Sequence, residues 1–122
     1  MQFEDTALAI IRLLGICYWV LLTVLLLVPD PLAMLGIRRL PGNGGVGVHF
    51  TAFAGLALLV AASRLPRRRW ILGLLLTYAV GVEAAQALVP SRTVEFRDLL
   101  ENLAGLASGI GVWRAIVWVR TT

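Results

Sequence analysis

Six polar side chains in an otherwise apolar chain have types and spacings that could do chemistry. They are His49, Glu83, Gln86, Arg92, Asp98 and Asn102. Glu83 and Gln86 stand at positions i and i+3, and Asp98 and Asn102 stand at i and i+4. Both spacings place two side chains on one face of a helix. Because polar and ionisable groups are costly in transmembrane segments and usually mark a functional site, the sequence predicts a polar pocket.

The composition indicates that these residues belong to a membrane protein. The 122-residue chain is 59% hydrophobic, with a mean hydropathy of +0.85, whereas soluble domains are about 45–50% apolar. A protein of 13.2 kDa cannot bury so much apolar surface, so lipid must cover much of it. The length predicts one transmembrane domain over residues 1–122.

The charge pattern agrees with a membrane location. The net charge is +4, and all eleven basic residues are arginines. In a soluble protein such an excess would suggest nucleic-acid binding, but here most arginines flank apolar runs, as in membrane proteins. We therefore expect no nucleic-acid partner. Cys17 is the only cysteine, which excludes an intramolecular disulfide and a cysteine metal site, and we predict neither a cofactor nor a metal.

Four apolar segments have about the length of 20 residues that crosses 30 Å of hydrocarbon. We expect transmembrane helices over residues 7–28, 46–63, 70–89 and 98–119. Each segment ends at proline or charge. The first segment begins with Glu4 and Asp5 and exceeds a signal-peptide core in length, so we expect it to be retained. The predicted fold class is an all-α integral membrane protein, a bundle of four transmembrane helices.

Arginine sets the predicted orientation. The short segment 64–69 contains four arginines, which is typical of a cytoplasmic loop. An even number of spans places both termini on that side, with seven arginines inside and four outside. We therefore predict a multi-pass protein of the bacterial cytoplasmic membrane, with both termini cytoplasmic. The six polar residues then lie in the outer half of the membrane or at its outer surface.

The fourth segment carries a second pattern. The face that bears Asn102 continues through Gly105 and Gly109. Small residues at this spacing let helix backbones approach closely in lipid. We expect this stripe to pack against the other helices, whereas Glu101 beside it is expected to be a solvated or interfacial charge.

Each polar residue also has a structural interpretation. Glu83 could pair with a nearby arginine and hold two helices together. Gln86 and Asn102 could form interhelical hydrogen bonds. Asp98 at the start of a helix could act as a cap, and His49 could be interfacial. The convergence of all of them on one side of the membrane favours a functional site.

In order, these motifs resemble the VanZ-like family of small polytopic membrane proteins over residues 46–110. The matching stretches are His49-Phe50 with Phe53, residues 81–86 (GVEAAQ) and residues 89–105 (VPSRTVEFRDLLENLAG). The third stretch is the most specific. Family members often have an Asp-Lys pair shortly before the histidine, where this chain has Gly45 and Val46. The departure bears on activity rather than on the fold.

The family takes its name from a protein associated with resistance to the lipoglycopeptide teicoplanin. The one-sided polar residues beside a basic loop predict an outward-facing pocket that binds or modulates a cell-envelope lipid, glycan or lipoglycopeptide, and the resemblance implies a possible role in glycopeptide resistance. Membrane lipids are the other expected partners, and a homo-oligomer is left open.

An intramembrane enzyme acting on an envelope lipid or glycan is the alternative. Glu83, His49 and Asp98 would then act as acid and base. The chain contains no nucleophile elbow, metal-ligand repeat or phosphate-binding glycine loop, which slightly favours a non-enzymatic role. A small transporter is a third hypothesis, but the polar residues stop in the outer half and leave no pathway through one chain.

Overall fold

The structure is a computed structural model that describes residues 2–27, 36, 47–89 and 96–122. Within these ranges it contains four helices and no strand. They are α1 (Gln2–Leu27), α3 (Val48–Ala62), α4 (Arg68–Gln86) and α5 (Phe96–Thr121). The predicted all-helical fold is confirmed, and each helix overlaps one of the four predicted segments.

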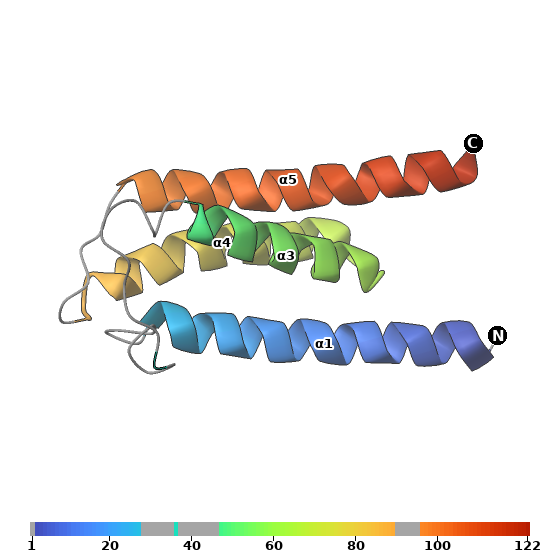
Figure 1. Cartoon of the computed structure of the whole chain (residues 1–122), viewed down its shortest axis with the longest axis horizontal. Coiled ribbons are helices and arrows are strands. Elements are labelled where there is room, and N and C mark those ends of the chain that lie inside the picture. The colour runs from blue at the N-terminus through green and yellow to red at the C-terminus, as the bar shows by residue number, and fades with distance from the viewer. Residues whose placement is uncertain (1, 28–35, 37–46, 90–95) are drawn as a thin grey trace.

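The helices form a bundle in which direction alternates along the chain (Figure 1). The end of α1, the start of α3, the end of α4 and the start of α5 therefore meet at one end, which we call the site end. The α3–α4 turn and both termini lie toward the opposite end. This alternation brings three of the predicted polar segments together at the site end.

Helix length differs across the bundle. Helices α1 and α5 have 26 residues each, or about 39 Å at 1.5 Å per residue. Both are long and apolar enough to cross a membrane, and only 17% and 22% of their most apolar windows are buried. A core helix of a soluble protein would be mostly buried, so their exposed apolar surface fits a membrane protein.

Helices α3 and α4 are shorter than the segments predicted for them. With 15 and 19 residues, they extend about 22 Å and 28 Å. Left-handed backbone bounds α3 on both sides, at Gly47 (φ 83) and at Arg64 (φ 48). Such a conformation cannot continue a right-handed helix. The boundary at Gly47 places His49 in the first turn of α3.

Close contact between α3 and α5 organises the interior. A Cβ atom on Gly105 would collide with the carbonyl oxygen of Phe50 and lie 3.0 Å from the backbone nitrogen of Ala54. A Cβ atom on Gly109 would collide with the carbonyl oxygen of Ala54. The two glycines are therefore what lets α5 lie directly on the α3 backbone.

Polar and aromatic contacts attach α1 to α3 and α4. The Tyr18 hydroxyl donates to the Ala52 carbonyl at 2.6 Å, and the hydroxyls of Thr23 and Tyr78 are 2.6 Å apart. The rings of Trp19 and Tyr78 pack edge to face with centroids 5.4 Å apart. Because interhelical hydrogen bonds are a main source of association in lipid, these contacts fix how α1 lies against α3 and α4.

The arginine-rich turn lies away from the site end. At its start, Arg12 of α1 donates from Nε to the carbonyl oxygen of Ser63 at 3.1 Å. Carbonyl groups at a helix end lack intrahelical partners, and a cation there also complements the helix dipole. The contact joins the first turns of α1 to the end of α3.

Candidate functional site

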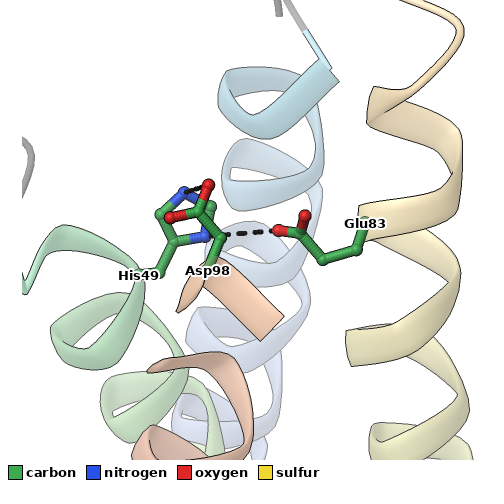
Figure 2. A group of neighbouring side chains, drawn as sticks. All are labelled: His49, Glu83 and Asp98. Atoms are coloured by element: carbon green, nitrogen blue, oxygen red, sulfur yellow. Dashed lines mark ion pairs between the residues drawn. The ribbon is translucent and has the colours of Figure 1, made fainter. Parts of the chain in front are cut away.

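Three helices bring together a histidine and two carboxylates at the site end (Figure 2). Glu83 Oε1 lies 3.9 Å from His49 Nδ1, and Asp98 Oδ2 lies 4.0 Å from His49 Nε2. The side chains of His49, Glu83 and Asp98 are 12%, 5% and 26% exposed, respectively. The ring therefore lies between two carboxylates, with the most accessible one on its Nε2 side.

Asn102 orients the histidine ring. It is completely buried, its Oδ1 lies 2.9 Å from His49 Nδ1, and its Nδ2 donates to the carbonyl oxygen of Ala79 at 3.4 Å. Only the NH₂ group of an amide can face a carbonyl oxygen, so Oδ1 must face the ring and accept. His49 Nδ1 therefore carries a proton. We call His49, Glu83, Asp98 and Asn102 the polar cluster.

This assignment predicts a specific tautomer for His49. Because the chain contains one histidine, selective ¹⁵N labelling gives resonances from this ring alone. We expect Nδ1 to carry the proton in the wild-type protein, and we expect Asn102→Leu to yield a mixture of tautomers. NMR of the protein in detergent micelles measures both states directly. A neutral ring with its proton only on Nε2 in the wild type would contradict the assignment.

The second ring nitrogen has a different environment. With a proton on Nδ1, Nε2 offers a lone pair toward the Asp98 carboxylate, which is 4.0 Å away. Two acceptors that face each other repel unless a proton or another cation lies between them. Nε2 and the Asp98 carboxylate therefore present two acceptors to a bound hydrogen-bond donor or cation.

Gln86 has a neighbouring but separate position. Its side chain is 2% exposed, and its Nε2 donates to the carbonyl oxygen of Leu26 at 2.9 Å. Leu26 lies in the last turn of α1, where carbonyl groups have no intrahelical partner. Gln86 thus joins the end of α4 to the end of α1 at the site end, which matches the structural interpretation that the sequence left open.

Glu101 lies in the site, although the sequence suggested a solvated or interfacial charge. Its side chain is 16% exposed, and its Oε1 accepts from the Gly47 backbone nitrogen at 3.2 Å. Arg97 Nε lies 3.6 Å from the same oxygen. Glu101 therefore caps the start of α3 with a carboxylate supplied by α5. The i, i+3 spacing from Asp98 was a signal for this placement.

Two arginines, Arg92 and Arg97, flank the start of α5 in the sequence. Arg92 lies outside the described residues. Arg97 has a 54% exposed side chain and pairs with Glu101 in an i, i+4 arrangement. An exposed pair of this kind contributes little to stability. Arg97 is therefore placed at the rim of the site rather than within the polar cluster.

The polar cluster can transfer protons, accept hydrogen bonds or hold a cation. Ligand atoms of His49, Glu83 and Asp98 all lie within 4.8 Å of one another. Imidazole and carboxylate groups are general acids and bases as well as metal ligands. Within the described residues, three side chains that can act as acids, bases or metal ligands therefore lie close enough to act on one bound group.

A cavity of about 170 Å³ lies elsewhere, between α3, α4 and α5 near the arginine-rich turn. Its walls are mostly apolar, with Arg64, Arg68 and Arg114 as their charged residues. It contains none of the histidine or carboxylate side chains of the polar cluster. Because acid–base and metal chemistry need such groups, we place the candidate functional site at the polar cluster.

Comparison with known families identifies the family of the chain. The model of the family described as VanZ/LLP1 matches residues 7–118, a range that includes the polar cluster and all but the ends of α1 and α5. No curated protein and no solved structure matches the chain at a significant level. The match extends over nearly the whole chain, and the protein belongs to the VanZ/LLP1 family.

Proposed function

We propose that this protein is a multi-pass membrane protein whose polar cluster faces the outside of the cytoplasmic membrane and binds the head group of an envelope lipid, a lipid-linked glycan or a lipoglycopeptide. The observation that carries the proposal is the convergence of His49, Glu83 and Asp98 from three helices at one end of an apolar bundle. Convergent polar groups in an apolar protein are typical of binding sites.

The chemistry of the polar cluster selects among head groups. Carboxylates accept hydrogen bonds, so Glu83 and Asp98 suit hydroxyl and ammonium donors. A phosphate would instead need cationic partners, and the described cation at the rim, Arg97, is already paired with Glu101. A sugar or amino-sugar group therefore fits the described residues better than a bare phosphate.

The orientation follows from the charges at the two ends. The arginine-rich α3–α4 turn lies opposite the polar cluster, and short arginine-rich loops stay in the cytoplasm. The polar cluster would then open outward, with both termini in the cytoplasm.

Cysteine accessibility tests this orientation. Thr51→Cys and Thr122→Cys are each introduced in a Cys17→Ser background, and a membrane-impermeant thiol reagent is added to intact cells. We expect the reagent to label only Thr51→Cys.

Expression in a susceptible host tests the function. We expect the wild-type protein to change susceptibility to a lipoglycopeptide such as teicoplanin and to change the amount of labelled antibiotic at the cell surface, relative to an empty vector. Lipids that copurify with the protein identify a lipid-linked ligand by mass spectrometry. If neither susceptibility, surface binding nor the bound lipids differ from the control, the proposal is wrong.

An intramembrane enzyme is the second candidate, because His49 lies between two carboxylates and is oriented by Asn102. A histidine held in one tautomer beside an acid is the arrangement that general acid–base catalysis requires. The lipid and muropeptide profiles of cells with wild-type protein and with Glu83→Gln separate the two candidates. Identical profiles, with the bound lipids changed, would favour binding over catalysis.

A further inference from the structure

We propose that His49, Glu83 and Asp98 bind a divalent transition-metal ion of the zinc and manganese class. One imidazole and two carboxylates form a mixed nitrogen and oxygen donor set, which suits these ions, whereas Mg²⁺ and Ca²⁺ prefer oxygen donors alone. The proposal stands on the geometry of the polar cluster and does not depend on the head-group ligand. Metal binding can therefore be measured without knowing the identity of the head-group ligand.

The spacing of the donors allows a common centre. Three atoms that lie within 4.8 Å of one another have a point within 4.8/√3, or about 2.8 Å, of all three. Zinc bonds to nitrogen and oxygen are about 2.0–2.2 Å long. Each donor would then move by roughly 0.6–0.8 Å, which small rotations of the Glu83 and Asp98 side chains can supply.

The orientation of the ring supports the same role. A histidine that binds a metal ion usually donates its other ring N–H to an oxygen acceptor, which fixes the tautomer. His49 makes this contact through Nδ1, at 2.9 Å from Asn102 Oδ1. Asn102 is held in turn by its contact with the Ala79 carbonyl. Nε2, which lies 4.0 Å from Asp98 Oδ2, is therefore the ring atom available to a metal ion, and Glu83 Oε1, which lies 3.9 Å from Nδ1, would have to turn toward it.

A cation would also bridge groups that already face one another in the polar cluster. The Nε2 lone pair faces the Asp98 carboxylate at 4.0 Å, and the Glu83 carboxylate approaches the same ring at 3.9 Å. Figure 2 shows the two carboxylates on different sides of the ring, supplied by different helices. A divalent ion bound by these groups would link α3, α4 and α5 through one centre.

Three protein donors would leave a coordination position for another ligand. Asp98 is the most exposed of the three side chains, at 26%, so the open position would face the accessible rim. Sites with three protein ligands and one exchangeable position are typical of metal ions that bind substrate or water. A hydroxyl, carboxylate or phosphate oxygen of a head group could occupy that position.

Metal content measures this proposal directly. The full chain carrying Cys17→Ser is purified in detergent through a tag without histidine, so that His49 and the carboxylates are the remaining strong ligands. It is then equilibrated with Zn²⁺ or Mn²⁺, and elemental analysis and calorimetry give stoichiometry and affinity. We expect about one ion per chain, and we expect His49→Ala and Asp98→Asn each to weaken binding at least a hundredfold.

Glu4→Gln is the matched control. It removes one carboxylate, as Asp98→Asn does, but Glu4 is exposed in the first turn of α1, at the opposite end of the bundle. We expect it to change affinity less than threefold, whereas Asn102→Leu should weaken binding about 10–100-fold through loss of ring orientation. Equal losses in Glu4→Gln and Asp98→Asn would overturn the proposal, because general negative charge would then explain the binding.

A measurement on the His49 ring of the wild-type protein tests the site without any substitution, so misfolding of a variant cannot explain its result. Addition of Zn²⁺ to ¹⁵N-histidine-labelled protein should shift the Nε2 resonance of His49 strongly and leave the proton on Nδ1. A ring that keeps its metal-free resonances at saturating Zn²⁺ would refute the site without any substitution. This readout is also independent of lipoglycopeptide susceptibility, so the metal proposal and the head-group proposal can fail separately.

Discussion

Gly109→Ala is expected to destabilise the folded bundle by about 1–3 kcal/mol, the usual range for overpacking. The added Cβ would collide with the Ala54 carbonyl oxygen and lie 2.8 Å from the Ala57 Cβ atom. Backbone atoms of a helix cannot rotate away as a side chain can, so α5 and α3 must separate. A Cβ atom at position 105 would collide with the Phe50 carbonyl oxygen of α3 in the same way. We expect the double variant to lose more stability than either single variant.

Gly111→Ala is the control for this prediction. Gly111 lies on the same helix, and a Cβ there would meet nothing within 4 Å. Since alanine favours a helix over glycine by about 1 kcal/mol, Gly111→Ala should be neutral or stabilising. Unfolding followed by circular dichroism in detergent compares the stabilities of these four variants. Equal stability of Gly109→Ala and Gly111→Ala would show that the α3–α5 contact is looser than described.

The same contact links packing to function. Phe50, whose carbonyl oxygen faces Gly105, is the neighbour of His49 in the first turn of α3. Separation of α3 from α5 would therefore move His49 away from Asp98 and Asn102. We expect Gly105→Ala to weaken ligand binding as well as stability, although Gly105 contributes no side chain to the polar cluster.

The double variant Glu83→Gln and Asp98→Asn is expected to abolish the effect of the protein on lipoglycopeptide susceptibility. Both amides keep the size of the carboxyl groups and remove the two negative charges that face His49. A hydrogen bond to a charged group contributes about 1.5–3 kcal/mol, so each lost carboxylate should raise the dissociation constant of a head-group ligand about tenfold to more than a hundredfold. Susceptibility assays and binding titrations measure the two effects.

Glu4→Gln with Asp5→Asn provides the matched control. This pair changes the net charge by the same amount, but both residues are exposed in the first turn of α1, at the opposite end of the bundle. We expect it to behave as wild type in both assays. If the control loses activity as fully as the double variant at the polar cluster, total charge rather than the site carries the function.

The polar residues show how far a sequence can identify a site. Glu83 and Asp98 were identifiable because charge within apolar segments is costly and alternating helices bring chain-distant segments to one end. Glu101 was misjudged because a carboxylate near a helix start usually faces water. Its true surroundings depend on the start of α3, where the Gly47 N–H points at it.

The helix boundaries also could be predicted only in part from the sequence. Apolar length indicates four segments, because hydrocarbon thickness demands about 20 residues per span. It does not show that α3 has only 15 residues, since left-handed backbone at Gly47 and Arg64 is a local conformation that hydropathy does not report. The short α3 in turn places His49 at the level of Asp98 and Asn102.

The sequence by itself determined the helical class, the number of apolar segments, the polar residues and the glycine stripe, because each follows from composition or from spacing along one helix. Only the tertiary structure decided which groups meet. The approach of α5 to α3 through Gly105 and Gly109 sets the distance from His49 to Asp98, and the Asn102 amide sets the proton on the ring. Both depend on how helices distant in the chain pack together. The glycine stripe predicts that α5 packs closely on another helix, but the spacing along one helix does not show which helix that is or which residues face each other.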